Sequence, residues 1–297
     1  MSKELTAHEL MDQELVDTIR ERLDSNRKAL HDLREVTRQL EMMNRKLQES
    51  EALKSHFLSN IRNEINNPLT SIMGLSRQLI TKPDAVENTA LVGPMIYMEA
   101  FNLDFQLQNI FIAAELEAGE ALPAYAKVDV AGVVETVLDL QVHQLSRKNV
   151  AVNKTIAKPL FLVSDAHKLQ IIIMNLLSNA LEFSPDGGEI EILVKSRDGG
   201  LYLMVRDNGI GIAPADQGQV FDRFKQLESG TTKGHPGHGL GLSVCKSLAE
   251  LMEGSITLTS APGEGCRVEV FLPEVSIDVN MTAQDSNVFL FDEPEEF

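Results

Sequence analysis

The 297-residue sequence has little of what several large protein classes require. It contains two cysteines, Cys245 and Cys266, whose spacing fits no metal site. Buried thiols in a reducing compartment are therefore expected in place of a disulfide framework. No apolar run approaches the ~20 residues of a membrane span, and the first residues do not resemble a signal peptide. The sequence thus predicts a cytoplasmic protein with no membrane attachment.

Basic residues are also scarce. The chain has 27 lysines and arginines against 44 aspartates and glutamates, which gives a formal net charge of -17. This balance argues against nucleic acid or an anionic membrane as the main partner, because either would favour a basic face. Hydrophobic residues make up 43% of the chain, which is enough for a packed core, and the length suits about two domains.

The N-terminal residues favour a coiled coil. Residues 8–50 lack proline and glycine and are dense in charge, and they carry two series of positions that repeat every seven residues. One series is Val16, Leu23, Leu30, Thr37 and Asn44, and the other is Ile19, Asn26, Leu33, Leu40 and Leu47. This spacing predicts that residues 1–50 form a coiled-coil helix. The helix acts either as a plain dimer stalk or as a signalling element whose packing shifts.

The apolar pattern of residues 51–120 predicts a helical hairpin. The first helix carries an apolar stripe typical of a bundle core, formed by Leu58, Ile61, Ile65, Ile72, Leu75 and Leu79. A break at 81–84 precedes a second helix at 85–118, which Gly93-Pro94 is expected to interrupt near its start. Two such hairpins would make a four-helix bundle, so a homodimer is predicted. Asn63 and Asn67 lie away from the stripe and are expected to face solvent.

From residue 121 the pattern changes to valine-rich strands that alternate with helices. Helices are predicted at 128–147 and 165–183, and β-hairpins at 189–206 and 255–272. Helices on one face of a mixed sheet make an α/β sandwich, so residues 121–273 are predicted to be one such domain and the chain to be α+β. Residues 274–297 contain seven acidic residues and no basic one, and a mostly disordered acidic tail is predicted.

Four motifs follow one another within the 121–273 region. They read IIIMNLLSNALEFSP at 171–185, DNGIGI at 207–212, VFDRF at 220–224 and GHGLGLSV at 237–244. Asn175 and Asn179 are four residues apart on a predicted helix, so both can meet the same ligand. A glycine-rich loop that opens onto a helix presents free backbone N–H groups, which favour anions. Each motif is a weak signal by itself, but their order and spacing make a strong joint signal.

Together the motifs resemble the nucleotide-binding domain shared by histidine kinases, gyrase, Hsp90 and MutL. The resemblance implies ATP and Mg²⁺ as cofactors, an adenine contact at Asp207 and a Mg²⁺ ligand at Asn179. The other nucleotide-binding positions that it implies are Asn175, Gly209, Gly211, Phe221, Phe224, Gly237, Gly239, Leu240 and Gly241. The sequence departs from the family at Glu182, where lysine is frequent, and at Cys266-Arg267, where small hydroxyl residues are usual. Either departure would reduce nucleotide affinity without preventing binding.

An earlier segment completes the resemblance. Residues 57–72 read FLSNIRNEINNPLTSI, which resembles the dimerisation and phosphoacceptor helix of two-component histidine kinases. Asn63 stands where that family has its phosphorylated histidine. A neutral imidazole has an available nitrogen lone pair, whereas the amide nitrogen of asparagine is delocalised into its carbonyl, so autophosphorylation at this position is expected to be lost.

The resemblance also gives roles to two neighbours of Asn63. In the family, the residue at the position of Glu64 polarises the histidine. The residue at the position of Asn67 orients the water that dephosphorylates the partner regulator. Glu64 and Asn67 therefore either preserve a phosphatase site or only cap and solvate the helix before Pro68.

Three functional interpretations stay open. The first is a dimeric histidine-kinase homologue that binds ATP and Mg²⁺ without autophosphorylating. It would act on a response-regulator receiver domain or another histidine kinase, as a regulator, scaffold or phosphatase. The second is an active sensor histidine kinase whose acceptor histidine has been replaced by mutation. The third is a non-catalytic coiled-coil interaction module, against which the intact glycine motifs argue.

Overall fold

The structure is a computed structural model that describes residues 2–81, 86–223, 225 and 239–275. The chain divides into two compact units, Met1–Ser59 and Asn60–Phe297. The first unit contains the N-terminal part of helix α1 (Ser2–Thr81), and the rest of this helix belongs to the second unit. The apolar side chains of the two predicted heptad series that the structure describes are exposed. The exposed fractions run from 49% to 62% for Ile19, Leu23, Leu30, Leu33, Leu40 and Leu47.

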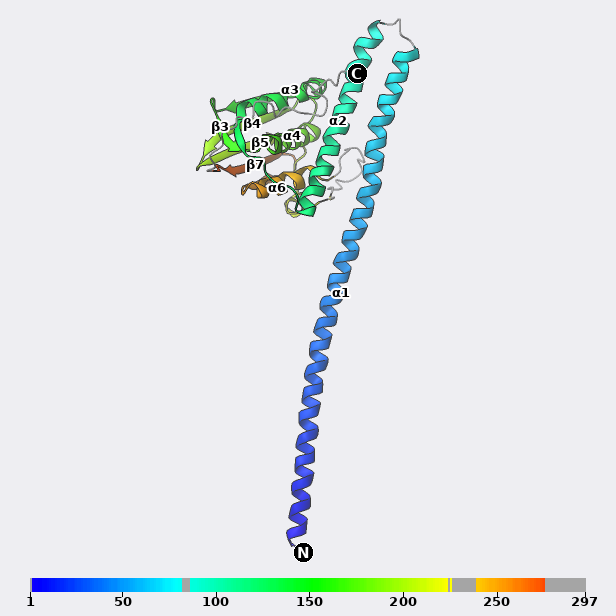
Figure 1. The fold of residues 1–297 in the computed structure, drawn as a ribbon, viewed down its shortest axis with the longest axis vertical. Coiled ribbons are helices and arrows are strands. Elements are labelled where there is room, and N and C mark those ends of the chain that lie inside the picture. Colours follow the sequence, from blue (N-terminus) through cyan, green and yellow to red (C-terminus); the bar gives the residue numbers. More distant parts are fainter. Residues whose placement is uncertain (1, 82–85, 224, 226–238, 276–297) are drawn as a thin grey trace. The chain divides into compact units, whose positions relative to one another are not determined.

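Helix α2 (Val86–Ala118) is the second helix of the predicted hairpin and is continuous in the structure (Figure 1). The expected interruption at Gly93-Pro94 is wrong, because the helix runs through Pro94. Proline removes one backbone hydrogen bond from a helix. Burial of the adjacent Val92, which is 4% exposed, and the many remaining backbone bonds of a 33-residue helix offset this loss.

The rest of the second unit is an α/β domain whose elements lie close to their predicted ranges. They are β1 (Ala126–Asp129), α3 (Val130–Lys148), β2 (Ala151–Ile156), β3 (Phe161–Ser164), α4 (Ala166–Phe183), β4 (Glu189–Arg197), β5 (Gly200–Asp207), α5 (Pro214–Gln217), α6 (Gly241–Leu251), β6 (Ser255–Ser260) and β7 (Cys266–Pro273). Five strands form a mixed sheet in the order β2-β4-β5-β7-β6, and β1 pairs with β3 separately. Only β2 and β4 are parallel within the larger sheet.

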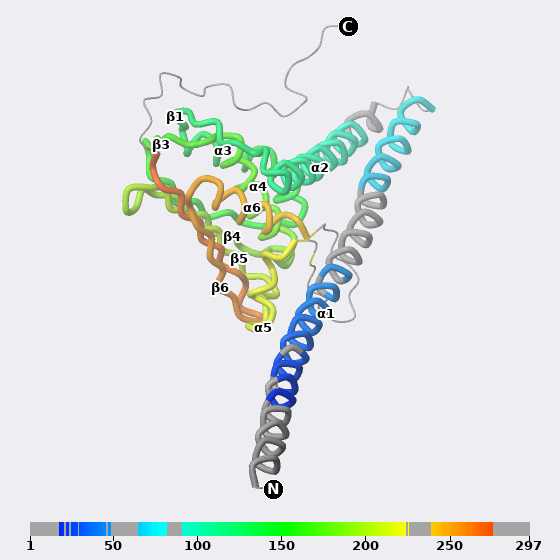
Figure 2. Tube along the Cα trace, turned by 60° about the horizontal axis from the view of Figure 1, so that its bottom comes forward, coloured from blue at the N-terminus to red at the C-terminus, as the bar shows by residue number. Residues whose placement is uncertain are grey.

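Helices α3, α4 and α6 cover one face of the larger sheet (Figures 1 and 2). Alternate residues of β4 point into this layer, and Ile190, Ile192 and Val194 are each 0% exposed. Helix α4 packs against α3, α6 and β5 and is buried continuously from Leu169 to Leu177. The domain is therefore a two-layer sandwich, as predicted, with α4 at the centre of its helical layer.

A side chain holds each end of α4: the N-cap residue at its start, and a lysine of α3 at its end. At the start, Asp165 caps the helix by accepting a hydrogen bond from the Lys168 backbone N–H at 2.9 Å. At the end, Lys148 of α3 donates from Nζ to the carbonyls of Leu181, Glu182 and Ser184 at 2.7 to 3.1 Å. A cation at a helix C-terminus satisfies free carbonyls and complements the helix dipole. These contacts hold α4, and the asparagines on it, in one position.

None of the helices in the described ranges combines the length and apolar composition that a bilayer crossing requires.

Candidate functional site

Two of the predicted site residues, Asn175 and Asn179, lie one turn apart on α4. Asn175 is 4% exposed. Its Nδ2 donates to the Ile171 carbonyl at 3.0 Å and to Oδ1 of Asn109 on α2 at 2.7 Å. Its Oδ1 faces the start of α6, since a Cβ added at Gly241 would lie 2.7 Å from that oxygen. The structure therefore brings the first and fourth motifs into direct contact.

Asp207 ends β5 and is 8% exposed. One of its carboxylate oxygens, Oδ1, accepts hydrogen bonds from the backbone N–H groups of Gly209 at 2.9 Å and Cys266 at 3.2 Å. Burial raises the pKa of Asp207, and these two hydrogen bonds act in the opposite direction. The carboxylate is therefore held in place by the loop that follows it and by the first residue of β7.

Close packing and hydrogen bonds hold the 207–212 loop in place. Gly211 has φ +68°, and a Cβ there would lie 1.9 Å from the Ala261 carbonyl oxygen, so only glycine fits. The Ser260 hydroxyl accepts from the Ile212 N–H at 2.8 Å and donates to the Gly265 carbonyl at 2.6 Å. Gln217 donates to the carbonyls of both Ile212 and Ser260. Sequence reasoning identified Gly209 and Gly211 but missed the role of Ser260.

The fourth motif places a helix N-terminus beside Asn175. Helix α6 begins at Gly241, and Leu240 at its N-cap makes no side-chain capping bond. Leu240 thus caps none of the first-turn N–H groups, and free N–H groups at a helix start favour anions. Leu240 is 1% exposed, and Gly239 packs against the backbone of Lys225. Phe224 and Gly237 lie outside the described residues.

The third motif contacts two other elements. Lys246 of α6 places its Nζ 5.9 Å from the centre of the Phe221 ring, and Arg223 Nη1 lies 3.8 Å from Glu117 Oε2 of α2. Phe221 is thus close to the helix that begins with the glycine motif. The segment therefore borders both α6 and α2, and its link to α2 was not predicted.

The hairpin residues are described less fully. Asn63 and Glu64 lie on α1, but their side chains are outside the described residues. Asn67 is exposed, as predicted. These three positions belong to the helical part of the chain, whereas the nucleotide motifs gather around α4, β5 and α6.

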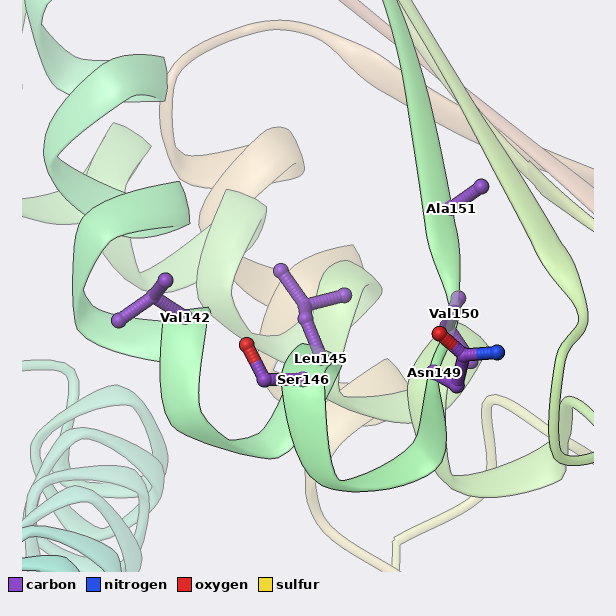
Figure 3. Close-up of a pocket in the computed structure, with 6 residues that line it drawn as sticks. All are labelled: Val142, Leu145, Ser146, Asn149, Val150 and Ala151. Carbon is purple, nitrogen blue, oxygen red and sulfur yellow. The ribbon is translucent and has the colours of Figure 1, made fainter.

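A separate hollow of about 280 Å³ lies between the end of α3 and the start of β2. Figure 3 shows the six side chains that line it, which are Val142, Leu145, Ser146, Asn149, Val150 and Ala151. It contains no charged group and none of the motif residues. The motif residues, and not this hollow, carry the chemical groups that a phosphate ligand needs.

Comparison with known families agrees with this geometry. Residues 164–276 match the family described as Histidine kinase-, DNA gyrase B-, and HSP90-like ATPase. The matched range starts at the last residue of β3 and includes α4, the 207–212 loop, α6 and β7. The fold, the site and this match together define the domain as a histidine-kinase-type ATPase domain.

The chain is similar to sensor histidine kinases over most of its length. It is 30% identical over 226 residues to the sensor-like histidine kinase SenX3 of Mycolicibacterium smegmatis, which covers 75% of this chain and 58% of SenX3. It is also 30% identical over 266 residues to the signal transduction histidine-protein kinase BarA of Escherichia coli K12, which covers 85% of this chain and 28% of BarA. The chain therefore spans only part of the length of these relatives.

Two solved structures share the fold. Full-length ShkA in complex with AMPPNP aligns with a TM-score of 0.54 and 23% identity, over 76% of this chain and 46% of ShkA. The Acinetobacter baumannii histidine kinase AdeS aligns with a TM-score of 0.51 and 20% identity, over 71% of this chain and 97% of the AdeS chain. At these identities the likeness concerns the fold alone.

Proposed function

We propose that this protein binds ATP with Mg²⁺ but does not autophosphorylate, and that it acts in two-component signalling as a regulatory pseudokinase or scaffold. Its partner would be the receiver domain of a response regulator or another histidine kinase, in the cytoplasm. The observation that carries the proposal is a contrast within the chain. The groups around Asp207, Asn175 and Gly241 are assembled, whereas Asn63 occupies the acceptor position of the resembling helix.

The residues around the site fit a magnesium nucleotide. The Asp207 carboxylate is fixed through Oδ1, and a carboxylate is a suitable acceptor for the adenine amino group. The start of α6 supplies backbone N–H groups for phosphate. The amide oxygens of Asn175 and Asn179 would contribute to holding Mg²⁺, which prefers oxygen ligands and is usually bound together with phosphates. The ion would supply charge neutralisation at the phosphates.

The first prediction tests the close approach between the phosphate loop and α4. Gly241→Ala should weaken binding of an ATP analogue by roughly tenfold or more, because its methyl group would lie 2.7 Å from Asn175 Oδ1 and push that oxygen away. Gly218→Ala is the matched control, since a Cβ at Gly218 meets nothing within 4 Å. Titration with a fluorescent ATP analogue measures both. Equal affinities for the two variants would contradict the placement of phosphate at this loop.

The lack of phosphotransfer follows from the chemistry at residue 63. An amide nitrogen is not a nucleophile, and the nearest histidine along this helix, His56, lies seven residues earlier. Seven residues of α-helix span ~10 Å, which is too far for a catalytic domain directed at position 63. Neither residue is therefore expected to receive the γ-phosphate.

The second prediction concerns the unmodified chain. Incubated with γ-labelled ATP and Mg²⁺, it should acquire no acid-labile, base-stable label, while equilibrium binding of an ATP analogue remains measurable. Label on the protein would contradict the proposal and lead to mapping of the acceptor, with His56→Gln as the first variant. Absence of both label and binding would instead favour the interaction-module interpretation.

A dimer is part of the proposal. Apolar side chains of both heptad series on α1 are about half exposed or more, and burying them against a second copy would remove a large apolar area from water. Large side chains on α2 are exposed as well, with Leu91 at 69% and Phe111 at 62%. Sedimentation equilibrium of the full chain should give twice the monomer mass of 32.8 kDa; a monomer mass would contradict it.

The exposed position of Asn67 on α1 favours one further activity, dephosphorylation of a partner receiver domain. This activity needs a residue that orients water, not a nucleophile on this chain, so the asparagine at 63 does not exclude it. The decay of a phosphorylated receiver domain should be faster with this protein than with its Asn67→Ala variant. Equal decay rates would leave the scaffold role.

The remaining alternative is a kinase altered by mutation at residue 63. The genomic codon for this residue decides it.

A further inference from the structure

Asn109 brings a polar side chain from the helical hairpin to the ATPase domain. It lies on α2, is 6% exposed, and contacts Asn175 of α4 through a 2.7 Å hydrogen bond. None of the four nucleotide motifs includes it. Figures 1 and 2 show the C-terminal part of α2 beside the helical layer of the domain, and α2 contacts α6 as well as α4.

The two amides orient each other. Asn109 donates from Nδ2 to the Phe105 carbonyl of its own helix at 3.0 Å, which leaves its Oδ1 directed at Asn175. Asn175 donates one N–H to that oxygen and another to the Ile171 carbonyl. A primary amide has only two N–H donors. Both donors of Asn175 therefore point away from the phosphate loop, and its acceptor Oδ1 is the atom that faces Gly241.

We propose that Asn109 is a positioning residue for the magnesium-nucleotide site, which holds the Asn175 amide with its oxygen toward the phosphate loop and thereby couples the position of α2 to Mg²⁺-dependent nucleotide affinity. This inference rests on the proposed function, in which the Asn175 oxygen contributes to the Mg²⁺ site. Without Asn109, one donor of Asn175 loses its partner and the amide is free to turn its nitrogen toward the loop. A nitrogen donor cannot ligate a cation.

Other contacts between α2 and the domain make the role of Asn109 separable from docking of the helix. Two turns before it, Asn102 accepts a hydrogen bond from Gln144 of α3 at 2.9 Å. Two turns after it, Glu117 lies 3.8 Å from Arg223. Neither pair includes Asn175. Loss of the Asn102 contact therefore removes one hydrogen bond between α2 and α3 and leaves the bond between Asn109 and Asn175 in place.

The experiment compares Asn109→Ala and Asn109→Leu with Asn102→Ala in the full chain. Leucine has nearly the shape of asparagine and favours helix, so it keeps the packing if alanine does not fold; far-ultraviolet circular dichroism checks this. Affinity for a fluorescent ATP analogue is measured with Mg²⁺ and with a chelator in its place. Removal of a residue that orients a metal ligand typically costs 10–100-fold in metal affinity. With Mg²⁺, both Asn109 variants should therefore bind the analogue about tenfold more weakly than the unmodified protein does. With the chelator, they should bind it as tightly as the unmodified protein does. Asn102→Ala should match the unmodified protein in both conditions.

Other results would overturn the inference. Unchanged Mg²⁺-dependent affinity in the Asn109 variants would show that Ile171 alone orients the amide. Tighter binding in those variants would show that the contact obstructs the site. Equal losses in Asn109→Ala and Asn102→Ala would assign the effect to docking of α2 as a whole. Failure of the unmodified protein to bind the analogue is a distinct outcome, since it would remove the proposed function itself.

Discussion

Replacing Asn63 with histidine should give a protein that labels itself with the γ-phosphate of ATP, whereas labelling of the unmodified chain should stay at background. Imidazole supplies the nucleophilic nitrogen that the amide lacks. In the proposed function, Glu64, Asn67 and Pro68 follow position 63 as the corresponding residues do in the phosphoacceptor helix that this segment resembles. Because a nucleophile is created where none exists, the expected increase is roughly 100-fold or more over background. The label should be labile to acid and stable to base, as a phosphohistidine is.

Two controls make this result specific. Asn63→Ala changes the same position without adding a nucleophile and should stay at background. Asn63→His combined with His56→Gln should label as strongly as Asn63→His alone, which assigns the phosphate to residue 63. An unlabelled Asn63→His variant that still binds the ATP analogue would show that more than the acceptor has been lost. The ATPase domain would then bind nucleotide without transferring phosphate, and the protein would be a scaffold even with a histidine at position 63.

The ATPase domain was largely predictable because its signals are local. The β-hairpin predicted at 189–206 is present as β4 and β5, and Asp198 and Gly199 in the turn between these strands both have positive φ. Asn175 and Gly241 were recognised separately, as members of two motifs 66 residues apart. Their direct contact follows from the packing of α4 on α6, which no local pattern reports.

Residues that connect elements were not predictable. Lys148 ends α3 with the appearance of an ordinary surface lysine, yet it caps α4. Asn109 lies in a segment of alternating polar and apolar residues, FNLDFQLQNI. The spacing of its apolar residues predicts a helix but does not identify the domain against which the helix packs. In both cases the partner is more than 30 residues away along the chain, so the information resides in the tertiary arrangement. The coiled coil, the domain boundaries and the roles of the site residues stay predictions.

The second large effect is expected at Asp207. Asp207→Asn keeps the shape of the side chain and removes one of two acceptor oxygens. In the structure Oδ1 already accepts from the N–H groups of Gly209 and Cys266, and the proposed adenine contact requires the second oxygen. An asparagine can satisfy the protein donors or the adenine amino group but not both, because its nitrogen would face one of these sets of donors. A hydrogen bond to a charged group contributes ~1.5–3 kcal/mol, so the affinity for an ATP analogue should fall by about 10- to 100-fold.

Base selectivity gives this prediction its sharpest readout. Guanine presents a carbonyl where adenine presents the amino group, so the unmodified protein should prefer ATP to GTP, and Asp207→Asn should narrow that preference by weakening ATP binding alone. Asp198→Asn is the matched control, because it makes the same charge change on a carboxylate that is 75% exposed in the β4–β5 turn. Competition of both nucleotides against the fluorescent analogue measures the ratio. If Asp207→Asn reduced both affinities equally, the carboxylate would be holding the loop between Gly209 and Cys266 without contacting the base, and the assignment of adenine recognition to Asp207 would be wrong.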